Sequence, residues 1–196
     1  MQYYIYSLFC FLLPGTVWLI CNRRMIADKA YKVRHIIWIY IYLFYGYLAV
    51  QEAAGIGTIW DLIAYGKLDN SINLIPFSSE GAMTYILNII MFMPLGFLLP
   101  LIWKNFRNAK KVVLMGFLMS LAIEICQLFN IRTTDIDDLM MNTLGALAGY
   151  CCWKVFSLIF RNAGTKCMEI KKSEPVIYMF GGILGLFLLY NWRVFD

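Results

Sequence analysis

The amino-acid sequence predicts an all-α membrane protein with about six transmembrane helices in one bundle. Of its 196 residues, 61% are hydrophobic and only 15% are charged, and the mean hydropathy is +0.66. A soluble domain has about a quarter of its residues charged. The charges here are also clustered between long apolar runs. We therefore expect one membrane domain over residues 1–196.

Six apolar runs approach the length of about 20 residues that a helix needs to cross a bilayer. They lie near residues 2–21, 35–54, 83–103, 112–130, 139–160 and 175–192. Polar residues interrupt the end of the fourth run and the start of the fifth. The N-terminus lacks a basic region and a small-residue cleavage site, which favours an uncleaved first span over a signal peptide.

Most of the 17 Lys and Arg residues follow the first, third and fifth runs, so these connections are predicted to share one side of the membrane. The positive-inside rule places that side in the cytoplasm. We expect a multi-pass protein of the plasma membrane. Both termini, the 55–82 segment and the Arg132–Asp138 loop then lie outside. The net charge of +5 is distributed as a topology signal, which argues against nucleic-acid binding.

Cysteine and histidine offer little metal chemistry. The six cysteines include no CxxC pair, and most fall in or beside apolar runs. The one histidine, His35, lies at the cytoplasmic edge of the second run. We predict that the cysteines are packing residues, that there is no transition-metal site, and that no cofactor is needed.

The 55–82 connection is predicted to form a short interfacial or re-entrant segment between spans two and three. Apolar residues around Trp60 recur at helical spacing, which favours a short helix lying in the outer interface. The residues from Asn73 to Phe77 allow two interpretations. They are either an apolar turn in which Pro76 delays the next helix, or a loop that dips back over an outer pocket.

Three polar residues lie deep in the third and fourth runs. Asn88 must find a hydrogen-bond partner, which is either a neighbouring helix or a ligand. Glu124 and Gln127 share one helical face, and a carboxylate at that depth is costly unless it is paired. Glu124 is therefore either half of an internal ion pair with Arg132 or a functional group, and the two roles are compatible.

A polar stripe organises the fifth run. Asp135, Asp138, Asn142, Gly145 and Gly149 follow one another at intervals of three and four, so they lie along one face of a helix. Polar side chains are unfavourable against lipid hydrocarbon, so this face is predicted to meet other helices or a water-filled pocket. The two glycines predict close packing against a neighbouring helix.

These residues resemble three blocks of the VanZ-like family in the same order. The first is Asn73-Leu74-Ile75-Pro76-Phe77, which resembles NLxPF. The second, from Asn88 to Phe97, resembles NxxxFxPLGF. The third is the ExxQ, RxxDxxD and NxxG series that runs from Glu124 to Gly145. The resemblance covers a core of about residues 73–150.

The resemblance implies a small bacterial cell-envelope protein whose polar residues gather toward one side of the membrane. The family is named for a member linked to resistance to lipoglycopeptides such as teicoplanin. The resemblance carries over no established catalytic residue. It therefore supports the location of a site more than it names a reaction.

The favoured hypothesis is an outward-facing polar pocket that binds a lipid headgroup, a lipid-linked cell-wall precursor or a lipopeptide drug. Arg132 would clamp a phosphate or carboxylate. Asp135 and Asp138 would accept hydrogen bonds from the ligand. The remaining predicted binding residues are Asn88, Glu124, Gln127 and Asn142.

Two alternatives remain open. In a membrane-embedded enzyme, Glu124, Asp135 and Asp138 are the catalytic candidates, with Arg132 stabilising negative charge. In that case Asp135 and Asp138 are also candidate ligands of a divalent cation. In a lipid or solute transporter, Glu124 would couple movement to protons. Six spans are few for a transporter, so oligomerisation is a further alternative.

Overall fold

The computed structural model describes residues 2–27, 32–65, 72–77, 81–129, 134–160 and 171–195. Over these residues the chain is mostly helical, with two strands of two residues each and short turns or irregular connections between elements. The elements are α1 (Gln2–Cys21), α2 (Arg23–Ala27), α3 (Lys32–Tyr47), the π-helix η1 (Leu48–Ala54), α4 (Ile59–Tyr65), β1 (Ile72–Asn73), α5 (Ala82–Ile102), the 3₁₀ helix η2 (Lys104–Phe106), α6 (Ala109–Gln127), β2 (Thr134–Asp135), α7 (Ile136–Ile159), α8 (Glu174–Leu189) and the 3₁₀ helix η3 (Trp192–Phe195). The predicted all-α class is confirmed.

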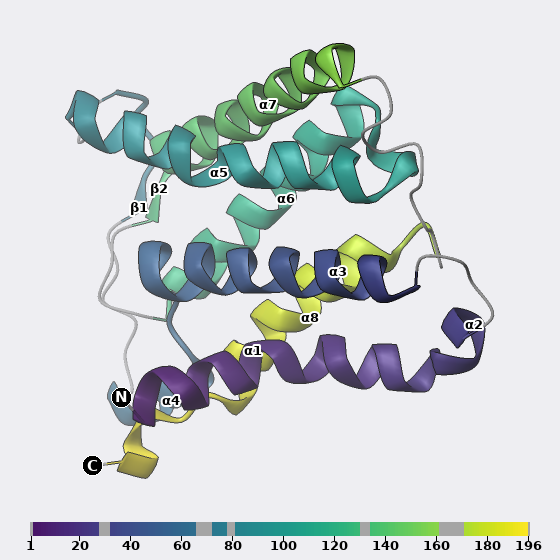
Figure 1. Cartoon of the computed structure of the whole chain (residues 1–196). Helices are drawn as coiled ribbons and strands as arrows, with labels where there is room; N and C mark the ends of the chain where they lie inside the picture. Colours follow the sequence, from purple (N-terminus) through teal and green to yellow (C-terminus); the bar gives the residue numbers. More distant parts are fainter. Residues whose placement is uncertain are drawn as a thin grey trace.

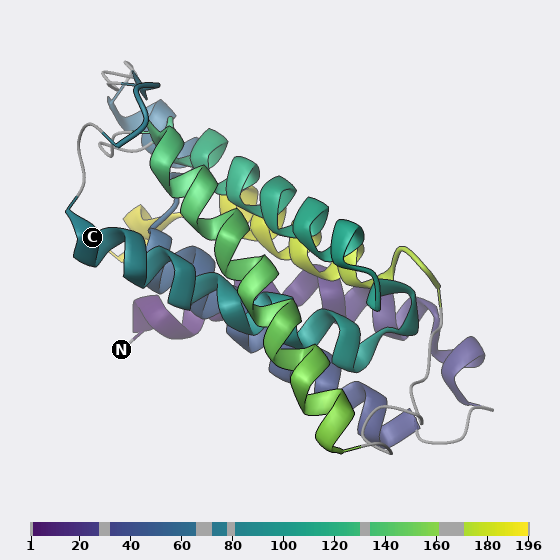
Figure 2. The ribbon, with the colours of Figure 1, turned by 90° about the horizontal axis from the view of Figure 1, so that it is seen from above.

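The long helices form two groups that meet along α3. Helix α7 packs on α5 and α6, whereas α8 packs on α1. Helix α3 contacts α1, α5 and α8, and so joins the groups. Figure 1 shows α1, α3 and α5 lying roughly side by side, with α6 and α8 crossing behind them. Figure 2 shows the same helices from above, with α7 running over the bundle.

The two ends of the bundle carry different segments. One end holds both chain termini, α4 and the two strands (Figure 1). The other end holds α2, the connection from α5 to α6, the end of α7 and the beginning of α8. The described basic residues before α3 and around η2 belong to this second end. The side of the membrane that each end faces stays a prediction.

Within the described residues, three segments are long and apolar enough to cross a membrane: Gln2–Cys21, Lys32–Ala64 and Ala82–Ile102. Helix α8 is apolar but has only 16 residues, which is short of the usual span. Helices α6 and α7 have 19 and 24 residues but include carboxylates near their facing ends. The apolar segments agree with a membrane protein, and the total of six spans stays a prediction.

The predicted close packing of the glycine stripe is confirmed at the contact between α5 and α7. A Cβ atom on Gly145 would lie 2.3 Å from the carbonyl oxygen of Ile89, and one on Gly149 would lie 1.9 Å from that of Met93. No side chain fits at such distances. The two glycines therefore let the helix backbones touch, and this contact fixes the position of the polar residues one turn above them.

A buried polar cluster that the sequence did not predict joins α3, α5 and α8 at the basic end. The carboxylate of Glu174 lies 2.9 Å from His35 Nε2. It also accepts hydrogen bonds from Trp103 Nε1 at 3.1 Å and Tyr178 OH at 3.0 Å. Glu174 and His35 are both buried. His35 lies on α3 and Trp103 directly follows α5, so the Glu174 carboxylate links α8 to both of these helices and is called the Glu174 clasp below.

The described cysteines are all free, and two of them pack in the interior. Cys10 and Cys126 are buried, as predicted. Cys21, Cys151 and Cys152 are exposed on helix surfaces, so their expected packing role is not borne out within the chain. Cys167 lies outside the described residues.

Candidate functional site

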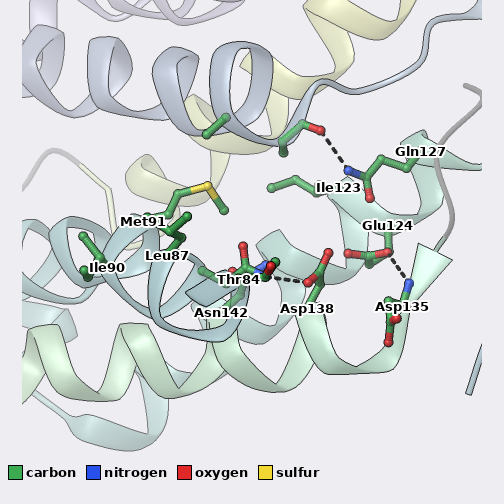
Figure 3. A pocket seen from close by; sticks show the side chains of 13 residues that line it. Thr84, Leu87, Ile90, Met91, Ile123, Glu124, Gln127, Asp135, Asp138 and Asn142 are labelled. Atoms are coloured by element: carbon green, nitrogen blue, oxygen red, sulfur yellow. Dashed lines mark hydrogen bonds between the residues drawn. The ribbon is translucent and has the colours of Figure 1, made fainter. Parts of the chain in front are cut away.

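Six of the seven predicted binding residues line one cavity of about 770 Å³. The cavity lies between η1, α5, α6 and α7, at the end of the bundle that holds the termini. Figure 3 shows the side chains around it. The lining residues are Ala53, Ala54, Thr84, Leu87, Asn88, Ile90, Met91, Ile123, Glu124, Gln127, Asp135, Asp138 and Asn142. The seventh predicted binding residue, Arg132, lies outside the described residues. The predicted Glu124–Arg132 pair therefore lies outside them as well.

The end of α6 supplies one polar wall. Glu124 and Gln127 are three residues apart in the last turn of this helix, and both are buried. Gln127 Nε2 donates a hydrogen bond of 2.9 Å to the carbonyl oxygen of Ala54. This bond holds the end of η1 against α6, and it fixes the orientation of the Gln127 amide because a carbonyl only accepts.

The beginning of α7 supplies the facing wall, and Asp135 is its N-cap. Asp135 Oδ1 accepts a hydrogen bond of 2.9 Å from the backbone N–H of Asp137, as an N-cap side chain does. The backbone N–H of Asp135 in turn donates to Glu124 Oε2 at 3.2 Å. The capping bond orients α7 so that Asp138, one turn on, faces the cavity.

Two amides connect the walls to one another. Asn88 Nδ2 on α5 donates to Asp138 Oδ1 on α7. Asn142 Nδ2 donates to Ser120 Oγ on α6 at 2.9 Å. The interhelical hydrogen bond expected of Asn88 is thus present, and its predicted contact with a ligand stays untested. Ser120 was missed by the sequence analysis, although it lies one turn before Glu124 on the same face.

The 72–77 segment supports the site from outside the cavity. β1 pairs in parallel with β2, so Ile72 faces Thr134 and Asn73 faces Asp135. Asn73 Nδ2 donates to Asp135 Oδ2 at 3.0 Å. Each Asp135 carboxylate oxygen therefore accepts a hydrogen bond from the protein. This short strand pair was not predicted from the sequence.

The backbone of Phe77 also contacts the beginning of α7. Its backbone N–H lies 2.9 Å from both carboxylate oxygens of Asp137, which also accepts a bond from Tyr85 OH. Phe77 has a φ of 61°, a strained value for a residue with a side chain, so these contacts stabilise an unfavourable backbone. None of the described residues 72–77 lines the cavity. The pocket-covering loop is therefore not confirmed, and Asp137 is a supporting residue that the sequence analysis missed.

The other half of the cavity is apolar. Leu87, Ile90 and Met91 on α5 lie opposite the carboxylates, as Figure 3 shows. Leu87 and Ile90 remain 56% and 54% exposed. The cavity therefore reaches the flank of the bundle along α5. These residues were not predicted, but they are helical neighbours of Asn88, which is the signal that points to them.

No group of three or more His, Cys, Asp or Glu side chains in the described ranges is arranged to hold a metal ion. Asp135 and Asp138 alone would leave most of the shell of Mg²⁺ or Ca²⁺ to water or to a ligand. The divalent-cation alternative at these two residues stays a prediction.

Comparison with known proteins identifies the chain's relatives. The model of the family described as VanZ/LLP1 matches residues 35–158. Protein VanZ of Enterococcus faecium is 37% identical over 134 residues, which are 67% of this chain and 77% of that protein. No solved structure matches. The resemblance predicted from the three blocks is confirmed, and all seven predicted binding residues fall within the matched range. The chain belongs to the VanZ/LLP1 family of membrane proteins.

Proposed function

We propose that this protein binds the polar headgroup of an amphiphile of the cell envelope in an outward-facing pocket. The ligand is a lipid, a lipid-linked cell-wall precursor or a lipoglycopeptide. The supporting observation is the 770 Å³ cavity, which combines a carboxylate and amide wall with an apolar wall open to the flank of α5. A ligand pocket with a few convergent polar groups has this character.

The two walls suggest how an amphiphile would lie. Its headgroup would contact Glu124, Asp138 and Asn142 at the polar wall. Its acyl chain would follow Leu87 and Ile90 toward the hydrocarbon of the bilayer. This arrangement leaves apolar surface against apolar surface and keeps the polar groups hydrogen-bonded.

Arg132 is the proposed anion clamp of this site. It is three residues before Asp135, which lines the cavity. A guanidinium binds phosphate or carboxylate through two parallel hydrogen bonds. We expect it to hold the phosphate or carboxylate of the ligand at the mouth of the pocket.

Family membership supports a proposed role of this protein in drug resistance. A lipoglycopeptide such as teicoplanin joins an acyl chain to a polar part, as the two walls of the cavity require. Binding or shielding of such a molecule at the outer surface is the resistance role we propose at the level of the family. The basic loops would then face the cytoplasm.

The proposal is tested by filling the cavity. Thr84 lines it, whereas the neighbouring Met83 is 69% exposed and does not. In native mass spectrometry of the purified protein, Thr84→Trp should lose bound phospholipid and Met83→Trp should retain it. The bound lipid of the wild type would also identify the ligand class. Equal lipid binding by the two variants would contradict the proposal.

An enzyme that acts on the same ligand is the second candidate. The observation that favours it is Glu124, a buried carboxylate at the cavity that accepts a hydrogen bond from the backbone N–H of Asp135. A general acid or base of this kind would lose its function in Glu124→Gln. Turnover of a lipid-linked substrate that disappears in this variant would favour the enzyme. Movement of unchanged lipid across reconstituted vesicles would favour the transporter.

A further inference from the structure

Asn142 on α7 carries a buried polar atom that the described part of the chain leaves unpaired. The residue is 2% exposed, and its Nδ2 atom donates a hydrogen bond of 2.9 Å to Ser120 Oγ on α6. Its Oδ1 atom is buried and has no hydrogen-bond partner among the described residues. Buried acceptors of this kind are rare, because leaving one unpaired is unfavourable. Since Asn142 lines the cavity, a bound ligand is in a position to pair with this atom.

The bond between Asn142 and Ser120 limits which chemical groups match this position. The Ser120 hydroxyl can both donate and accept, so the Asn142 amide can turn over and keep its bond to Ser120. One orientation leaves the amide oxygen for a ligand, and the other leaves the amide NH₂ group. A ligand hydroxyl pairs with either, whereas an ammonium group pairs only with the oxygen and a phosphate only with the NH₂ group. A hydroxyl therefore matches the position best.

The neighbouring carboxyl groups are compatible with a hydroxyl ligand in either protonation state. Asp138 accepts a hydrogen bond from Asn88, and Glu124 accepts one from the backbone N–H of Asp135, so both carboxyl groups have partners within the protein. A hydroxyl can donate to an ionised carboxylate and accept from a protonated carboxyl group. A hydroxyl ligand therefore requires no particular charge on Asp138 or Glu124.

Thr84 adds a second neutral polar group to the cavity. It lies on α5, so it faces the cavity from a different helix than Asn142 (Figure 3). Its hydroxyl can donate or accept a hydrogen bond, as a ligand hydroxyl can. No Lys, Arg or His occurs among the described residues that line the cavity, so none of these residues offers a cation to a phosphate. The described lining therefore suits an uncharged headgroup with more than one hydroxyl.

We propose that the polar wall of the cavity binds the hydroxyl groups of a neutral polyol headgroup, with the Asn142 amide and the Thr84 hydroxyl as its hydrogen-bond partners. This assignment rests on the proposed function and narrows its ligand to amphiphiles that carry glycerol or a sugar. Glycerol and sugar headgroups present the same hydroxyl chemistry to these two residues, and the test below separates them.

The test compares each lipid with its O-methyl form, which has the same acyl chain and the same charge but no hydroxyl to donate. The full-length protein is titrated by native mass spectrometry in an amine-oxide detergent, which carries no hydroxyl of its own. One pair is monooleoylglycerol and its di-O-methyl ether, and the other is glucosyl dioleoylglycerol and its tetra-O-methyl ether. Methylation should weaken binding by about tenfold or more, as expected when a buried acceptor loses its partner. The hydroxyl lipid that binds more tightly identifies glycerol or sugar as the source.

Variants connect the preference to the cavity. Asn142→Leu should bring the affinity ratio of hydroxyl to O-methyl lipid close to one, and Thr84→Val should lower this ratio. Asn142→Leu combined with Ser120→Ala removes both members of the buried pair, which provides a second route if Asn142→Leu alone does not fold. Thr143→Val is the matched control, because Thr143 does not line the cavity and its hydroxyl donates to the carbonyl oxygen of Leu139. It should keep the wild-type ratio.

The outcomes separate the hydroxyl assignment from the function beneath it. Equal binding of the hydroxyl and O-methyl lipids by the wild type would overturn the hydroxyl assignment and leave lipid binding intact. A preference that survives in the Asn142 variants and in Thr84→Val would also overturn it, as would an equal loss of preference in Thr143→Val. Binding of none of the four lipids would contradict the proposed function itself, and the hydroxyl assignment with it.

Discussion

Glu124 Oε2 accepts a hydrogen bond of 3.2 Å from the backbone N–H of Asp135, which joins the end of α6 to the beginning of α7. Thr134 Oγ1 adds a longer contact of 3.4 Å to the carbonyl oxygen of Glu124. These bonds close the polar end of the cavity. Glu124 therefore has a structural role in holding α7 as well as its proposed role toward a ligand.

The N-cap role of Asp135 predicts a difference between two substitutions. Asp135→Asn keeps a side-chain oxygen that can cap α7, whereas Asp135→Ala removes it. We expect Asp135→Ala to lower the free energy of unfolding by about 1 kcal/mol relative to Asp135→Asn. Thermal unfolding in detergent measures the difference. Identical stabilities of the two variants would show that the capping bond does not stabilise the helix.

The contact between α5 and α7 predicts that Gly149 tolerates no larger residue. Gly149→Ala would bring a methyl group within 1.9 Å of the carbonyl oxygen of Met93, so the two helices must move apart. We expect a loss of about 1–3 kcal/mol in the free energy of unfolding, as for other overpacked sites. Gly181→Ala is the matched control, because its added Cβ meets only Pro14 Cβ at 3.4 Å. A loss as large in the control would contradict the packing account.

The Glu174 clasp predicts a loss of stability without a loss of binding. His35→Ala removes the imidazole that lies 2.9 Å from the buried carboxylate of Glu174, and the loss of one partner of such a buried pair costs about 3 kcal/mol. His35→Gln should recover part of the lost stability because the glutamine amide can donate a hydrogen bond to Glu174. Helix α8, which starts with Glu174, begins at the opposite end of the bundle from the two strands (Figure 1), so the lipid affinity of the folded protein should not change. A changed lipid affinity would contradict this expectation and would show that the two ends of the bundle are energetically coupled.

The sequence predicted the long helices and six residues of the candidate site. Helical periodicity placed Asp138, Asn142 and the two glycines on one face, and depth in an apolar run singled out Asn88 and Glu124. These signals are local. Contacts between distant segments have no such signal, and the pairing of β1 with β2 and the Glu174 clasp were missed for that reason. Residue pairs such as His35 and Glu174 are 139 positions apart.

The predicted orientation in the membrane determines which introduced cysteines are accessible to a reagent outside the cell. A cysteine in place of Thr134, in a variant without the native cysteines, should react with an impermeant thiol reagent added to intact cells. A cysteine in place of Lys171, beside the start of α8, should react only after the membrane is opened. The reverse pattern would invert the orientation, and labelling of both from outside would contradict a membrane crossing by α7, the helix between the two positions.

The central claim is that the cavity holds an amphiphile with its headgroup at the carboxylates and its acyl chain along α5. Photo-crosslinking of the purified protein with two phospholipids tests this most directly. One carries a diazirine beside the headgroup and the other carries it midway along the acyl chain. The account predicts that the first labels residues 124–142 and the second labels residues 87–91, and that Thr84→Trp suppresses both. Labelling spread over the outer surfaces of all helices, unchanged in Thr84→Trp, would contradict it.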